Sequence, residues 1–84
     1  MPLPTESATL TAAEVDELSK QLSTMRHDIN NHLSLIMAAV ELVRRKPEAL
    51  ERMASTLVEQ PARVSEAMAN FSASFERTLG IKRN

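Results

Sequence analysis

The chain is defined first by what it lacks: it has no cysteine, no tryptophan and no tyrosine, and only one glycine among its 84 residues. Without cysteine, neither a disulfide framework nor a cysteine-based metal site can form, and this composition suits a reducing cytoplasm, where we expect the protein to act. The longest apolar run, residues 35–40, is too short to cross a bilayer, and no hydrophobic leader opens the chain. We therefore expect a soluble protein with no membrane partner.

The sequence has no large excess of positive or negative charge, because it contains ten lysines and arginines and eleven aspartates and glutamates. No basic stripe with interleaved aromatics is present, so we expect no nucleic-acid partner. No metal-type cluster or cofactor motif appears, so neither a metal site nor a bound cofactor is expected. A single core of this size usually contributes only a few kcal/mol, which favours oligomerisation.

Two long amphipathic helices account for most of the sequence. After a flexible lead-in over residues 1–10, Thr11 and Glu14 form a capping box that starts a helix spanning about residues 11–45. A basic run and Pro47 then mark a tight turn at about residues 45–47. The apolar stripe of this helix, with spacings of three and four, is Val15, Leu18, Leu22, Met25, Ile29, Leu33, Ile36, Val40 and Val43.

The second helix is predicted over about residues 47–79, with Gly80 as its left-handed end and residues 82–84 as a tail. Pro61 lies inside it, where it removes one backbone hydrogen bond and favours a kink near the level of Asn31. The seam of this helix contains Leu50, Met53, Leu57, Val64, Met68, Phe71 and Phe75.

We predict an all-α fold in which residues 11–81 form a long antiparallel two-helix hairpin. Two helices cannot cover their own apolar faces, because residues 35–40 are apolar around most of the helix circumference. A symmetric dimer of hairpins, which is a four-helix bundle, would cover them. The alternative is a hairpin that packs on a larger, different partner.

A polar patch centred on His27 lies in the middle of the first helix, and the helix does not need these residues in order to fold. His27 lies about 200° from Met25 and from Ile29, so its ring is predicted to face solvent while the seam faces another helix. Asp28 can orient such a ring through one nitrogen or take up its proton. A lone surface histidine is usually without function, but small or polar residues surround this one: Ser23, Asn30, Asn31 and Ser34.

The run His27-Asp28-Ile29-Asn30-Asn31-His32-Leu33, followed by an apolar helix, a short turn and a second long helix, resembles a known family. It is similar to the dimerisation and phosphoacceptor (HisKA-like) domain of two-component histidine kinases, over about residues 15–79. The resemblance implies that His27 accepts phosphate and exchanges it with the aspartate of a response-regulator receiver domain. It also implies that Asp28 is the general base and that Asn31 helps to orient water for receiver dephosphorylation.

The resemblance also implies a receiver-docking surface between the histidine and the hairpin end. Its residues would be Ser23, Asn30, Ser34, Arg63 and Ser65. The expected partners are a second copy, the receiver and a separate ATP-binding kinase domain, and either partner domain would supply magnesium. His32, about 140° from His27, stands where many family members have proline, and we expect it to pack near the seam.

No ATP-binding domain or nucleotide loop accompanies the motif, so we expect no autonomous kinase activity. The chain could be a stand-alone phosphotransfer module or a segment of a longer kinase, and the start at Met1 favours the former. The competing hypothesis is a dimeric helical scaffold or inhibitor that binds a kinase or receiver without phosphate passing through His27.

Overall fold

The computed structural model describes residues 9–80, which form two long helices and a short connection. Helix α1 spans Ala12–Arg45 and begins with the predicted capping box. The Thr11 hydroxyl accepts the Glu14 amide at 3.0 Å, and the Glu14 carboxylate accepts the Thr11 amide at 2.9 Å. Two of the free amides at the helix start are thereby satisfied, so the first turn is well fixed.

The connection is a single 3₁₀ turn, Pro47–Ala49, which differs from the predicted direct start of the second helix at Pro47. Lys46 leaves the helical conformation, and its amide bonds to the Leu42 carbonyl at 2.8 Å. Ala49 is buried against α1 because the tight turn carries it inward. Pro47 has no amide to satisfy, so it is well suited to the first position of the turn.

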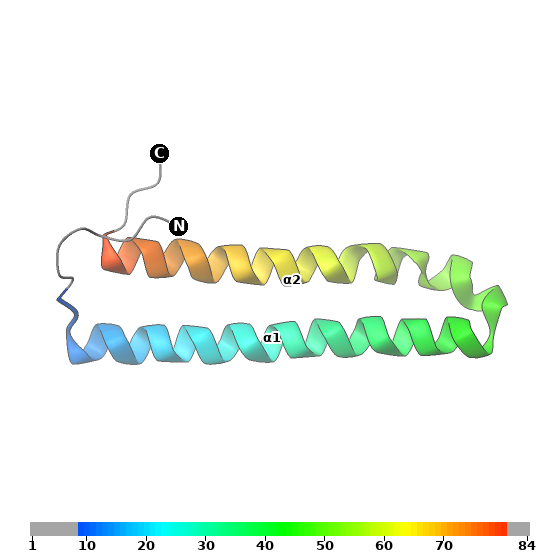
Figure 1. The fold of residues 1–84 in the computed structure, drawn as a ribbon, viewed down its shortest axis with the longest axis horizontal. Helices are drawn as coiled ribbons and strands as arrows, with labels where there is room; N and C mark the ends of the chain where they lie inside the picture. The colour runs from blue at the N-terminus through cyan, green and yellow to red at the C-terminus, as the bar shows by residue number, and fades with distance from the viewer. Residues whose placement is uncertain (1–8, 81–84) are drawn as a thin grey trace.

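Helix α2 spans Leu50–Leu79 and ends at Gly80, whose φ of 70° is left-handed as the sequence predicts. The Gly80 amide bonds back to the carbonyls of Glu76 and Arg77. Near its start, α2 bends relative to the straight stretch that follows (Figure 1). Pro61 explains the bend, because its missing amide leaves the Leu57 carbonyl without its helical partner and its ring pushes that carbonyl aside.

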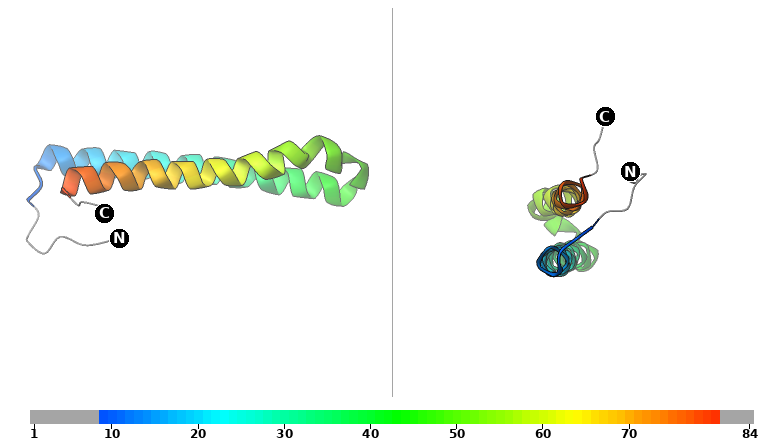
Figure 2. Two further views of the ribbon diagram at one scale, coloured as in Figure 1. Left: turned by 90° about the horizontal axis from the view of Figure 1, so that it is seen from above. Right: turned by 90° about the vertical axis from the view of Figure 1, so that its left-hand side faces the viewer.

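The two helices run antiparallel along their whole length and make a single layer (Figures 1 and 2). The molecule measures 56 × 28 × 13 Å, with a radius of gyration of 17.8 Å. A globular domain of similar length would have a radius of gyration of about 11 Å. The all-helical hairpin of the prediction is therefore confirmed for the described residues, and its elongated shape leaves most side chains near the surface.

Two hydrogen bonds between side chains fix how the helices align. Nδ1 of His32 lies 2.6 Å from Oε1 of Gln60, and the Ser74 hydroxyl donates to Oε1 of Gln21 at 2.5 Å. Because the helices are antiparallel, moving toward the N-terminus of α1 corresponds to moving toward the C-terminus of α2. His27 therefore lies level with Ser65, and Pro61 lies close to the level of Asn31, as predicted.

Very little of the hairpin is buried. Among the described residues, only Ala39 and Ala49 are buried apolar residues, at 3% and 1% exposure. Many larger apolar side chains remain open to solvent. We call the following set, which lies on one flank of the hairpin, the apolar face: Val15, Leu22, Leu33, Val40, Leu50 and Met68.

The described helices contain no segment long and apolar enough to cross a membrane. The predicted lead-in, apart from residues 9 and 10, and the predicted tail lie outside the described residues.

Candidate functional site

His27 lies on the outer surface of α1, turned away from α2. The seam residues Met25 and Ile29, two positions before and after it, are by contrast half-buried. Within residues 9–80 no hydrogen bond or ion pair reaches its ring. Both ring nitrogens are therefore available to an approaching group, as the helical periodicity predicts.

Asp28 and Asn31 are exposed on the same side of α1. Counting about 100° per residue from the inward-facing His32, Asp28 lies about 40°, Asn31 about 100° and His27 about 140° around the helix in one direction. The three side chains thus form an arc that begins beside the seam and ends at the outer surface. Around the helix, the Asp28 carboxylate and the Asn31 amide therefore lie between the seam and the His27 ring.

The other predicted docking residues of α1 complete the outer surface around His27. Ser23 and Ser34 are exposed, and the Ser34 hydroxyl donates to the backbone carbonyl of Asn30 at 2.9 Å. That bond folds the serine back along its own helix, so it projects little. The surface next to His27 therefore has low relief, which permits another protein to approach the ring closely.

Arg63 and Ser65, the predicted docking residues of α2, lie on opposite flanks of the hairpin. Relative to the inward-facing Gln60, Arg63 lies about 60° to one side and Ser65 about 140° to the other. Arg63 shares its flank with Asp28 and pairs with Glu66 at 3.8 Å. Ser65 shares its flank with the apolar face, so a single hairpin does not bring the two residues to one surface.

His32 is a residue of the helix interface. Its ring is half-buried, and its bond to Gln60 makes it the main polar link between the middles of the two helices. A single acceptor fixes the ring in one orientation. The prediction that His32 packs at the seam is confirmed, whereas its partner Gln60 was not predicted.

A groove of about 420 Å³ opens between the helices on the flank that carries Asp28. It lies mostly on the terminal side of His27, and of its lining residues only Asp28 was predicted as a site residue. The groove is lined by Glu17, Lys20, Gln21, Thr24, Met25, Asp28, Ala67, Asn70, Phe71 and Ser74.

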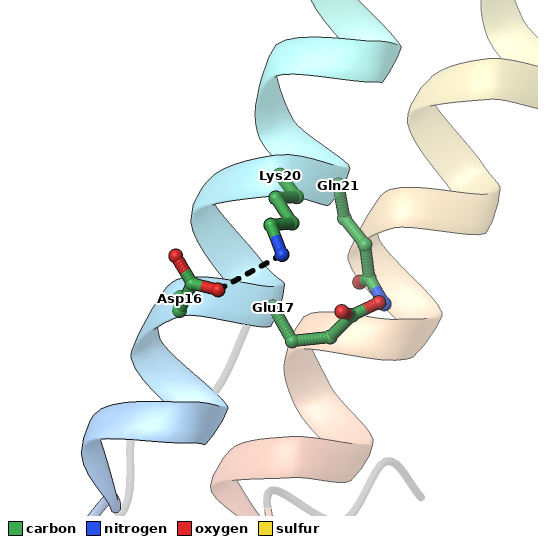
Figure 3. Close-up of polar contacts among 4 residues, drawn as sticks. All are labelled: Asp16, Glu17, Lys20 and Gln21. Carbon is green, nitrogen blue, oxygen red and sulfur yellow. Dashed lines mark hydrogen bonds and ion pairs between the residues drawn. The ribbon is translucent and has the colours of Figure 1, made fainter.

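Figure 3 shows four polar side chains of α1, of which Glu17, Lys20 and Gln21 line the groove. The Lys20 ammonium pairs with Asp16 at 3.0 Å, and the Gln21 amide donates to Glu17 at 3.2 Å. Both pairs join residues one helical turn apart on α1. The Gln21 side chain also reaches α2, because its Oε1 accepts the Ser74 hydroxyl.

A signal in the sequence could have found Gln60. In the seam of α2 the step from Leu57 to Val64 skips a turn, and in α1 the polar His32 stands next to the apolar stripe at the same level. Two polar residues at matching levels of two facing seams indicate a hydrogen bond across the interface. The groove had no such signal, because its lining residues come from two helices and include polar, charged and apolar side chains.

The described residues contain no group of three or more histidines, aspartates and glutamates that could hold a metal ion. Comparisons with protein-family models, with curated proteins and with solved structures find no match for this chain.

Proposed function

We propose that this hairpin is a phosphotransfer module of two-component signalling, in which His27 accepts a phosphoryl group and exchanges it with a receiver aspartate. The observation that carries the proposal is the position of His27. It is an exposed histidine without a partner in the described chain, it is followed directly by Asp28, and it lies on the first helix of an antiparallel hairpin. The low relief around the ring gives a receiver domain access to it.

The chemistry uses one nitrogen of the neutral imidazole as nucleophile. As the nitrogen–phosphorus bond forms, the phosphorus–oxygen bond to the receiver aspartate breaks, and that carboxylate leaves with the electron pair. The ring becomes cationic and loses the proton on its other nitrogen, for which Asp28 is the nearest carboxylate in sequence. The reverse transfer restores the neutral ring. Asn31, one turn further on, can orient a water molecule toward a receiver aspartyl phosphate.

The apolar face supports assembly of two copies into a four-helix bundle. Its side chains lie about 80–100° from the line that joins the two helices of one hairpin, measured from His32 in α1 and from Gln60 in α2. If two helices made the whole structure, the apolar arc of each helix would point toward the other helix. In a four-helix bundle, the arc points between the other helix of the same hairpin and the second hairpin. The arc of this chain fits the second arrangement.

The edges of the apolar face indicate how the two copies are oriented. Near the turn the edges are apolar, since Met37 and Val58 are 70% and 74% exposed. Near the termini they are polar, with Ser19, Arg26 and Ser72. A two-fold axis along the helices pairs apolar edges with apolar edges, whereas a perpendicular axis would pair them with polar ones. We therefore propose that the two-fold axis runs along the helices, so that both turns lie at the same end of the dimer.

This dimer would complete the docking surface. With the axis along the helices, α1 of one copy lies beside α2 of the other on the flank of the apolar face. Ser65 of the second copy then lies beside Asn30 and Ser23 at the level of His27. Arg63 would thus contribute to the docking surface of its own copy, and Ser65 to the docking surface of the other copy. This explains how Ser65 can belong to a docking surface although it lies on the opposite flank from Arg63 in one hairpin.

A single spin label tests the dimer. The chain has no cysteine, so Glu48→Cys in the exposed turn gives one labelling position per copy. With both turns at one end, the label-to-label distance is expected to be about the width of a bundle, near 20–25 Å. A perpendicular axis would separate the labels by about 50 Å, the length of α1. Absence of any dipolar coupling would rule out the dimer at that protein concentration.

The function is tested by phosphate transfer from phosphorylated receiver domains of the host. Wild-type protein is expected to gain acid-labile, base-stable label, and His27→Gln, which keeps a polar side chain of similar length, is expected to lose it. Loss of receiver phosphate without labelled protein would replace transfer by a phosphatase role assisted by Asn31. Binding of a receiver or kinase that His27→Gln leaves unchanged, with no transfer, would establish the scaffold instead.

A further inference from the structure

The interhelical groove lies on the flank opposite the apolar face, so assembly of two copies through that face leaves the groove open. Its apolar lining residues are Met25 of α1 and Ala67 and Phe71 of α2, with Phe71 one turn after Ala67 on the same helix. Because Ala67 is small, a side chain from outside can enter between the two larger residues. The hydrogen bond from Ser74 to Gln21 joins two of the lining residues across the helices.

The rims of the groove differ in charge. The α2 rim carries no charged lining residue, because Asn70 and Ser74 are its polar members. The α1 rim carries Glu17, Lys20 and Asp28, and the Lys20 charge is balanced by Asp16 at 3.0 Å. Two carboxylates and one ammonium thus line this rim, which gives its lining residues a net charge of −1. An occupant that follows this rim is favoured if it is basic.

The length of the groove indicates the shape of its occupant. Glu17 and Asp28 stand three turns apart on α1, which is about 16 Å along the helix. A third helix of three turns laid between α1 and α2 spans that length, and it can place one apolar side chain into the hollow above Ala67.

We propose that this groove binds a helix of a partner protein that presents one large apolar side chain flanked by lysine or arginine. The apolar side chain packs between Met25 and Phe71, and the flanking cations lie near Glu17 and Asp28. The interaction does not depend on phosphorylation of His27 or on the dimer, and it would hold a partner beside the histidine on its terminal side.

The probes are two synthetic 16-residue alanine-based helices that share a central leucine. One carries lysines on both sides of the leucine and the other carries glutamates at the same positions. Each is titrated into ¹⁵N-labelled full-length protein at low salt. We expect the lysine peptide to shift the amides of Thr24, Met25, Asn70 and Phe71, and to bind at least ten-fold more tightly than the glutamate peptide.

Two variants locate the binding. Ala67→Leu fills the hollow and is expected to weaken the lysine peptide at least ten-fold, whereas Ala69→Leu, the same change at an exposed position of α2, leaves its affinity unchanged. Glu17→Lys is expected to weaken the lysine peptide several-fold without altering the fold, since Glu17 is exposed. Circular dichroism and sedimentation confirm that each variant keeps its helices and association state.

The proposal is overturned if neither peptide shifts groove amides at millimolar concentration, or if the shifts map to the apolar face. Equal affinity for the two peptides, or an Ala67→Leu protein that binds like wild type, also overturns it. None of these outcomes depends on phosphate transfer. The groove can therefore fail to bind a helix while His27 transfers phosphate, and it can bind a helix when His27 does not transfer phosphate.

Discussion

His27 and His32 lie on the same helix, little more than one turn apart, and differ in almost every structural respect. His27 is exposed and without a partner in the described part of the chain. His32 is half-buried and bonded to Gln60 across the interface. Five residues correspond to about 140° of helix rotation, so the difference follows from the period of the helix alone.

The comparison shows that one helix can place one histidine at its interface and another on its outer surface. A ring that fixes the alignment of two helices must hold one nitrogen against a neighbour, and it cannot easily turn to serve a reactant. A ring on the outer surface contributes nothing to alignment and keeps both nitrogens accessible. This contrast is compatible with the proposed phosphate transfer at His27 and with a structural role for His32 at the interface.

The largest expected difference is in stability. His32→Ala leaves half-buried Gln60 without its partner and is expected to cost about 1–2 kcal/mol of unfolding free energy. His27→Ala removes no contact and is expected to change it by less than about 0.5 kcal/mol. Urea denaturation at one fixed protein concentration measures both. Equal costs for the two variants would contradict this contrast.

A double-mutant cycle separates the hydrogen bond from other effects of removing the ring. Gln60→Ala, alone and combined with His32→Ala, is expected to give a coupling energy of about 0.5–1.5 kcal/mol. The same cycle between His27 and Gln60 serves as the matched control and is expected to give none. A coupling near zero for His32 and Gln60 would mean that the contact does not stabilise the hairpin.

A smaller difference is expected in chemical reactivity. Diethyl pyrocarbonate acylates accessible neutral imidazoles, so His27 is expected to react several-fold faster than His32. Mass spectrometry of digests after short exposure identifies the modified ring. His32→Gln keeps one reactive histidine and is the control for assignment. Faster modification of His32 would show that the interface opens more readily than the bond to Gln60 implies.

The helices themselves were predictable from local chemistry. Thr11, Glu14 and Gly80 mark the helix ends by caps that depend only on residues nearby, and the structure places them where the sequence predicts. The turn was less predictable, because a proline at the first position suits both an α-helix and the 3₁₀ turn observed. Burial of Ala49 against α1 accompanies the 3₁₀ form, and that is a contact between distant parts of the chain.

The candidate site was predictable in part for the same reason. Exposure of His27 follows from its angle to the seam on one helix. The positions of Arg63 and Ser65 on opposite flanks, and the groove beside Ala67, depend on how the second helix is rotated against the first. That rotation is fixed by contacts such as His32 with Gln60, which no property of a single helix specifies.

The smallest expected difference concerns the proton on each neutral ring. Oε1 of Gln60 can only accept, so Nδ1 of His32 must donate and carry the proton, which leaves its Nε2 unprotonated. His27 has no such neighbour and is expected to keep the Nε2-protonated form that free imidazole side chains prefer. Long-range ¹⁵N–¹H correlation spectra at high pH distinguish the two forms. A Nε2-protonated His32 would mean that Gln60 offers its amide group instead, and Gln60→Glu, which can only accept once ionised, would then convert His32 to the Nδ1-protonated form while His27 stays unchanged.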